Sequence, residues 1–168
     1  AEHRYTVKLE GAENYKAPTC TEDGFQVWQC QDCNKATKTE TLEKTGHSNY
    51  KVGTVNDPSQ SAAGSWQVVC GVCGDVIKDN IAIPALPTTS GNGYTVTSTG
   101  TACVDGITYT CEYTATVEGV TFEDTYTFKT AKVAHDKGEA YSWTATLADG
   151  TTWDYKGYYC KICGKVVV

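Results

Sequence analysis

Three Cys-x-x-Cys pairs constrain this chain more than any other feature. Each pair ends a short run of aromatic and β-branched residues and is followed at once by Gly or Asn, as in "GFQVWQCQDCNK", "GSWQVVCGVCGD" and "YKGYYCKICGK". Gly and Asn tolerate the left-handed backbone of a tight turn. The pattern predicts three copies of one small unit, in which a strand leads into a turn that carries two thiols. The pairs are Cys30/Cys33, Cys70/Cys73 and Cys160/Cys163.

The three histidines of the chain repeat in step with the cysteine pairs. His3, His47 and His135 each precede a pair, with 22 to 26 residues in between. This regular spacing predicts three zinc-ribbon-like units. Boundaries predicted from a sequence are accurate only to within several residues. The predicted units are 1–46, 47–134 and 135–168.

The middle unit is the longest and contains the strongest strand pattern. Apolar and polar residues alternate in "ITYTCEYTATV" (107–117) and again in "VTFEDTYTF" (120–128), and a Glu-Gly turn separates the two runs. Strict alternation with a turn between predicts a β-hairpin. It lies within 101–130, where Asp105-Gly106 predicts a further turn. The Pro- and Gly-containing stretch 82–94 before it predicts a connection.

No segment shows the periodicity of an amphipathic helix. We therefore predict an all-β fold of tandem small zinc-ribbon-like β-hairpin modules, with a longer β-hairpin insertion in the middle unit. No run of eighteen apolar residues occurs, so no membrane-spanning helix is expected.

Nine cysteines and three histidines predict metal sites. The odd number of cysteines means that disulfides within the chain cannot use them all. Zn²⁺ prefers four tetrahedral thiolate or imidazole ligands, and twelve donors make three sets of four. We therefore expect two or three structural zinc ions. The expected first site is His3, Cys20, Cys30 and Cys33. The expected second site is His47, Cys70, Cys73 and Cys103. The expected third site is His135, Cys160, Cys163 and a fourth ligand that the pattern leaves open.

Several alternatives remain open for the other cysteines. Cys111 is a poor fourth ligand for the third site, because its place on the apolar side of a strand equally predicts a buried free thiol. The third site could also be incomplete, or use an Asp, a water or a residue outside the chain. A Cys103–Cys111 disulfide across the Asp105-Gly106 turn is a further alternative in a secreted protein. Iron could replace zinc, although closed thiolate-imidazole sites favour zinc.

The sequence argues against catalysis and against nucleic-acid binding. Four protein ligands leave no open position on a zinc ion, and a redox Cys-x-x-Cys pair would need a βαβ context that is missing. No zinc-protease helix motif, nucleophile elbow or phosphate-binding loop occurs. The chain has a net charge of −6 and lacks the clustered Lys and Arg that binding to nucleic acids requires. We therefore expect no enzyme activity.

Parts of the chain resemble Cys/His repeats of large secreted and cell-wall proteins of Gram-positive gut anaerobes. The matching stretches are "APTCTEDG", "CQDCNK" and "LEKTGHSNY", and "TACVDGITYTCEYTATVEGVTFEDTYTF" (101–128) resembles a longer variant. Asn34 and Cys111 depart from the repeats, and so does the Pro58-Ser59-Gln60-Ser61 stretch, where another unit could place a cysteine. The resemblance implies a non-catalytic part of a surface or secreted protein, located outside the cell or in the cell wall. It also implies that Cys103 completes the site of Cys70 and Cys73.

Two functions compete on these observations. The first is a structural module that spaces or presents other domains of the same surface protein, because repeats build rods and platforms. The second is a module that binds carbohydrate or mucin glycans, or a host protein, through exposed aromatic rings. In "YSWTATLADGTTWDY" two Trp lie on the arms of a predicted hairpin, nearly opposite each other. The candidate ligand-binding residues are Trp66, Trp143, Trp153, Tyr158 and Tyr159.

Overall fold

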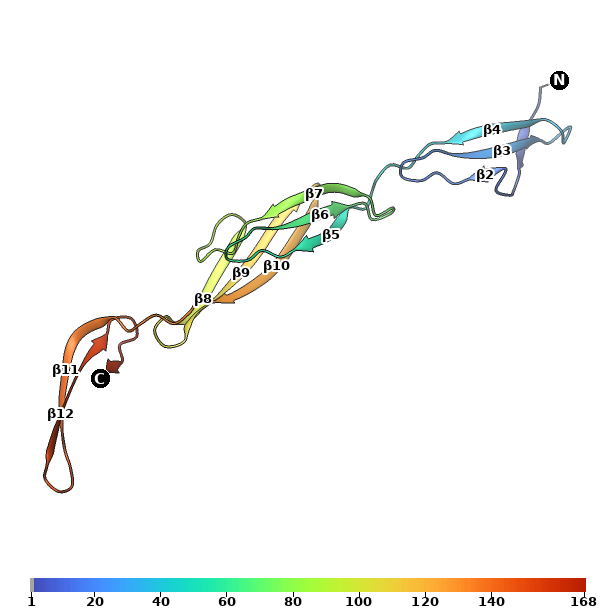
Figure 1. The fold of residues 1–168 in the computed structure, drawn as a ribbon. Coiled ribbons are helices and arrows are strands. Elements are labelled where there is room, and N and C mark those ends of the chain that lie inside the picture. The colour runs from blue at the N-terminus through green and yellow to red at the C-terminus, as the bar shows by residue number, and fades with distance from the viewer. Residues whose placement is uncertain (1) are drawn as a thin grey trace. The chain divides into compact units, whose positions relative to one another are not determined.

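The computed structural model describes residues 2–168 and confirms the all-β class (Figure 1). The described residues form thirteen strands in four small antiparallel sheets and no helix. Accordingly, none of residues 2–168 forms a helix that could cross a membrane. Contacts group the chain into two compact bodies. The first body contains the residues up to Pro58 with 63–83 and 116–121, and the second contains 59–62, 84–115 and 122–168.

Two sheets are built from the first half of the chain. In the first, β3 pairs with each of the other three strands, and in the second, β6 lies between its two partners. The first sheet consists of β1 (Tyr5–Lys8), β2 (Tyr15–Lys16), β3 (Gly24–Cys30) and β4 (Thr37–Leu42). The second consists of β5 (Lys51–Asn56), β6 (Gly64–Val69) and β7 (Val76–Ile83).

The second half of the chain forms the other two sheets. The third has the order β10-β9-β8 and the fourth the order β11-β12-β13. The third consists of β8 (Tyr94–Thr101), β9 (Gly106–Val117) and β10 (Val120–Lys129). The fourth consists of β11 (Lys137–Thr146), β12 (Thr152–Cys160) and β13 (Val166–Val167). In the first, second and fourth sheets, the central strand leads directly into a Cys-x-x-Cys turn, as the sequence predicts.

The hairpin predicted in the middle unit is present as β9 and β10. Glu118 and Gly119 join the strands with φ of 50° and 75°, the left-handed backbone that a two-residue hairpin turn requires. The predicted connection 82–94 is correct except at its ends. Ile83 is a fully buried residue of β7, and Tyr94 begins β8. The strand β8 itself was not predicted, because its Thr- and Ser-rich sequence carries little apolar signal.

Apolar packing is concentrated in the second and third sheets. In the first body Trp66, Val68 and Ile83 are completely buried. In the second body the rings of Tyr94 and Tyr113 lie 4.9 Å apart, and the ring of Phe122 lies 6.1 Å from that of Tyr113. Elsewhere, residues 2–168 bury few large hydrophobic side chains.

The first and fourth sheets bury no hydrophobic side chain except cysteine. Within residues 2–46 the buried hydrophobic residues are Cys20 and Cys30, and within 135–168 the only one is Cys160. A sheet needs one face packed on a core to be stable by itself. These two sheets therefore depend on something other than apolar burial.

Gly64 provides a direct test of the tight entry into β6. A Cβ at this position would lie 2.2 Å from the carbonyl oxygen of Asn56, and Gly24 has the same relation to Lys16 at the start of β3. Because backbone atoms must move to admit the methyl group, we expect Gly64→Ala to cost about 1–3 kcal/mol and to lower the Tm. Ala63→Ser, at the exposed neighbouring position, is the matched control. Equal Tm values for the two variants in thermal unfolding by circular dichroism would contradict this close packing.

Candidate metal centres

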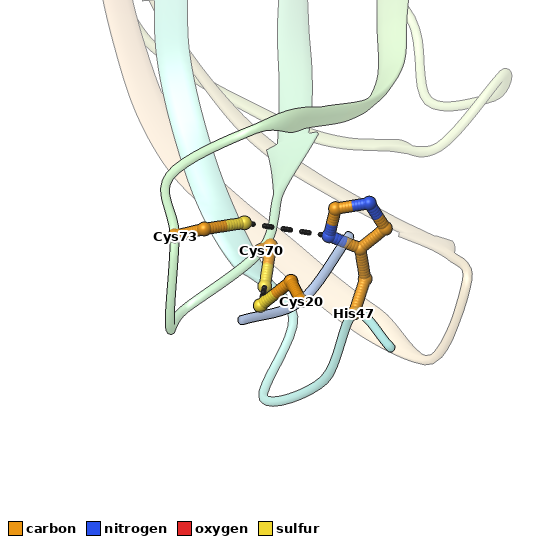
Figure 2. A group of neighbouring side chains, drawn as sticks. All are labelled: Cys20, His47, Cys70 and Cys73. Carbon is orange, nitrogen blue, oxygen red and sulfur yellow. Dashed lines mark hydrogen bonds between the residues drawn. The ribbon is translucent and has the colours of Figure 1, made fainter. Parts of the chain in front are cut away.

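The structure gathers eleven of the twelve Cys and His residues into three clusters. Within each cluster the candidate ligand atoms all lie within 4.8 Å of one another. The first cluster is His3, Cys30 and Cys33. The second is Cys20, His47, Cys70 and Cys73, whose side chains point toward a common centre (Figure 2). The third is Cys103, His135, Cys160 and Cys163.

A shared backbone arrangement forms the turn of each cluster. The residue after the first cysteine donates its N–H to the carbonyl of the residue after the histidine, and the turn closes on the carbonyl of the first cysteine. The first bond joins Gln31 to Arg4 (2.9 Å), Gly71 to Ser48 (3.2 Å) and Lys161 to Asp136 (2.9 Å). The second is donated by Asn34, Gly74 and Gly164, whose φ values are 52°, 83° and 68°. The Gly or Asn after each pair therefore supplies the expected left-handed residue.

The histidine lies beside the second cysteine in all three clusters. The Nδ1–Sγ distance is 3.6 Å for His3 and Cys33, 3.3 Å for His47 and Cys73, and 3.5 Å for His135 and Cys163. The predicted association of each histidine with the following cysteine pair is therefore correct in space.

The predicted place of Cys20 is wrong. Its Sγ lies 3.9 Å from Sγ of Cys70 and belongs to the second cluster, not to the first with Cys30. The reason is the length of β3. Cys20 precedes this seven-residue strand and Cys30 ends it, and a strand of that length spans roughly 20 Å. One metal ion cannot bind thiols at both ends.

The predicted place of Cys103 is wrong in the same way. Its Sγ lies 3.7 Å from Sγ of Cys160, so it completes the third cluster, whose fourth donor the sequence left open. Cys103 lies in the turn between β8 and β9. The ligand set implied by the resemblance, with Cys103 beside Cys70 and Cys73, is not found.

Matching hydrogen bonds bring the lone cysteine and the histidine together in both four-residue clusters. The residue two positions before the histidine donates its N–H to the carbonyl just before the cysteine. These bonds join Thr45 to Thr19 (2.9 Å) and Val133 to Ala102 (3.0 Å). The order along the chain is therefore lone cysteine, histidine, cysteine pair. That shared order was a signal in the sequence that could have corrected the grouping.

The loop 57–64 repeats the shape of the loop 17–24 without its thiol. Ser59 donates its N–H to the carbonyl of Ala62 at 2.8 Å, as Thr19 does to Glu22 at 2.9 Å. Gln60 therefore occupies the position that corresponds to Cys20. This loop brings no cysteine to a cluster.

The second cluster favours a thiolate at Cys70. A hydrogen bond from the backbone of Cys73 has the largest effect on the pKa of Cys70, and the pKa falls to about 5 although burial opposes this. In the third cluster, burial and the neighbouring thiols raise the pKa of Cys103 to about 12. A bound divalent cation would reverse this second shift, because a coordinating thiol is deprotonated. The donor set of thiolate and imidazole fits Zn²⁺.

Cys111 belongs to no cluster and forms no disulfide. It is completely buried, and its thiol donates to the carbonyl oxygen of Pro87 at 3.4 Å. Burial raises its pKa above the usual value. All nine cysteines are free, so the alternative Cys103–Cys111 disulfide is not formed.

The candidate ligand-binding aromatics divide into three groups. Trp66 is completely buried, so its prediction as a ligand-binding residue is wrong. Trp143, Trp153 and Tyr159 are 49%, 60% and 41% exposed. Tyr158 is half-buried, and the amine of Lys137 lies 5.4 Å from the centre of its ring.

The two Trp of the last hairpin share a face but are not opposite each other. Trp143 pairs with Tyr155, on which it stacks with ring centres 4.5 Å apart, and Trp153 pairs with Ala145. Paired residues and residues two apart lie on one face of a strand pair. The structure therefore adds Tyr155 to this face. Sequence reasoning missed it because the pattern did not fix which residues form the turn, and so did not show which residue pairs with Trp143.

Comparisons of the chain with protein-family models, with curated proteins and with solved structures find no match.

The grouping of Cys20 can be tested by alkylation of the metal-loaded chain. We expect Cys20→Ser to make Cys70 and Cys73 reactive toward iodoacetamide, because the second cluster loses one of its four ligands. Labelling at Cys30 and Cys33 should stay as in the unchanged chain. Peptide mass mapping locates the label. Increased labelling of Cys30 and Cys33 instead would support the grouping expected from the sequence.

Cys111 should behave as a buried, protonated thiol. Because its pKa is raised, the group stays neutral at pH 8, and we expect no alkylation in the folded chain even after chelation of metal. Cys111→Val should leave the number of bound metal ions unchanged in native mass spectrometry. A reduced metal count in this variant would show that Cys111 is a ligand.

Proposed function

We propose that this chain is a non-catalytic, zinc-stabilised extracellular module that spaces or presents domains of a bacterial surface or secreted protein. The observation that carries the proposal is that the first and fourth sheets bury only cysteines among their hydrophobic residues. Small domains that cannot bury enough apolar surface are commonly stabilised by a structural metal. The cysteines that these sheets bury belong to clusters that fit Zn²⁺.

Each four-residue cluster draws ligands from two successive sheets. Cys20 comes from the loop before β3 and meets the cysteine pair that follows β6. Cys103 comes from the turn before β9 and meets the pair that follows β12. A metal ion at each cluster would tie one zinc-ribbon-like unit to the next. Such links suit a protein that must hold other domains at a set spacing.

The hairpin region of the middle unit supports the same interpretation. In the first unit the thiol lies in loop 17–24, whereas the corresponding loop 57–64 carries Gln60. We interpret β8, β9 and β10 as an insertion that supplies Cys103 in place of the missing thiol. The link between units is then kept although the middle unit is longer.

The two complete clusters support a structural role for the metal. Three thiolates and one imidazole fill the four positions that Zn²⁺ prefers, and closed sites of this kind stabilise folds. The other domains of the same surface protein are the proposed partners. The extracellular or cell-wall location rests on the resemblance to secreted repeats.

A second candidate function is glycan binding by the exposed face of the β11–β12 hairpin. Three aromatic side chains, Trp143, Trp153 and Tyr155, lie on this face and are each at least 36% exposed. Aromatic rings with one free face are suited to contacts with ligands that are partly apolar. This face is the observation that favours a carbohydrate, mucin or host-protein ligand.

The structural role predicts that metal and stability are lost together. Native mass spectrometry should find two or three zinc ions that are absent from the denatured chain, whose mass should show reduced thiols. Chelation should lower the Tm, because binding only to the folded state stabilises it. A denatured mass lower by eight hydrogens, with no metal, would mean four disulfides and would contradict the proposal.

If the exposed aromatic face binds glycans, binding should be lost when its Trp side chains are removed and kept when a residue outside the face is changed. Trp143→Ala with Trp153→Ala should abolish retardation in affinity electrophoresis on mucin or on a gut polysaccharide that retards the unchanged chain. Thr152→Ala, an exposed position on the opposite face of β12, is the matched control and should keep the retardation. Migration of the unchanged chain without retardation on every polymer would eliminate this second function.

A further inference from the structure

The first cluster has the architecture of the other two but one ligand fewer. Among residues 2–168, only His3, Cys30 and Cys33 bring donor atoms to it. Its turn has the same backbone hydrogen bonds, and its histidine lies beside its second cysteine at a similar distance. Cys30 is completely buried, like Cys70, and Cys160 is almost completely buried. The difference lies in the missing counterpart of Cys20 and Cys103.

The carboxylate within the Cys-x-x-Cys turn does not take the fourth place. Asp32 lies between the two cysteines of the turn, but both of its oxygens accept hydrogen bonds from the guanidinium of Arg4, one of them at 2.9 Å. No carboxylate oxygen lies within 4.8 Å of the three donor atoms in the part of the chain that the structure describes. Arg4 therefore engages the carboxylate that lies between the two cysteines.

The other thiols of the chain are already engaged. Cys20 and Cys103 lie in the second and third clusters, and Cys111 is buried against Pro87. A second copy of the chain would have the same thiols engaged in the same way. A fourth thiol for this cluster would therefore come from a different unit with a free lone cysteine.

The chain itself shows what kind of segment supplies such a cysteine. In loop 17–24, Thr19 accepts the N–H of Glu22 on its hydroxyl at 3.0 Å and bonds the carbonyl of the same residue through its own N–H. This tight turn presents Cys20 to a cysteine pair in the following sheet. The Cys30/Cys33 turn of the first cluster could accept a cysteine in the same way. Among the described residues, no loop brings a cysteine to it.

We propose that the first cluster is the acceptor half of a metal-mediated joint, and that its fourth ligand is the cysteine thiolate of a loop like 17–24 on another unit of the same type. As the joint forms, the sulfur binds the metal and the thiol proton passes to solvent. No oxidation takes place. The inference rests on the proposed structural role of the metal, and it adds a partner of defined chemistry at one site.

The joint can be tested on the full chain with a peptide of its own sequence. The probe is the synthetic peptide of residues 13–26, at millimolar concentration, with zinc-loaded chain and a reductant. We expect one peptide to bind per chain in native mass spectrometry and the alkylation of Cys30 and Cys33 to slow several-fold. The same peptide with Cys20→Ser should do neither. A chain with Cys33→Ser, whose other two clusters are intact, should not bind the peptide.

Tethering the peptide to the chain allows binding to be detected even when the affinity of the free peptide is weak. The same peptide is joined ahead of the chain by a flexible Gly/Ser linker, which raises its effective concentration to the millimolar range. With Co²⁺ as probe, we expect the tethered thiol to add thiolate-to-cobalt absorption that is absent from the Cys20→Ser tether.

The outcomes separate the two proposals. If the second and third clusters hold metal and the tethered thiol changes neither absorption nor alkylation at Cys30 and Cys33, the joint is wrong and the structural role stands. If no cluster holds metal, both proposals fail. Binding that persists in the Cys33→Ser chain would place the peptide elsewhere and would also overturn the joint.

Discussion

The fold depends on the meeting of thiols and imidazoles that come from separate segments of the chain. In the second cluster, Cys20 and His47 reach the Cys70/Cys73 turn from different loops. Thiols at 3.9 Å gain little from each other, and thiolates gathered in a buried place repel one another unless a cation is bound. A divalent metal would supply the favourable interaction that apolar packing does not. The first and fourth sheets would depend on such an ion most, because cysteine is the only hydrophobic residue type that they bury.

The remaining sheets have a more ordinary source of stability. Trp66 and Ile83 in the second sheet, and Tyr94, Tyr113 and Phe122 in the third, bury large side chains. Burial of such side chains contributes about 1.5–3 kcal/mol each. The second and third sheets can therefore be stabilised by apolar contacts, whereas the first and fourth would rely on metal bound at the clusters. This division agrees with the proposal that bound metal would link one unit to the next.

Two features of the chain are available for contacts with other molecules. The hairpin of β11 and β12 exposes Trp143 and Trp153, although aromatic side chains are usually among the first to be buried. The first cluster offers a three-donor site to another unit. One feature would serve recognition and the other would serve assembly, and neither requires a change in the arrangement of the strands.

The sequence by itself determined the chemistry and the local structure. Spacing identified the Cys-x-x-Cys turns and the histidine beside each, and alternation located β9 and β10, because both patterns act over short distances along the chain. Only the tertiary structure decided which cysteine meets which pair. Cys20 is closer in sequence to Cys30 than to Cys70, but a strand of fixed rise separates Cys20 from Cys30, whereas the loop that carries Cys20 lies beside the next turn. Trp66 was misjudged for a related reason, since an aromatic residue in a strand faces a core or solvent according to packing that its local sequence does not contain.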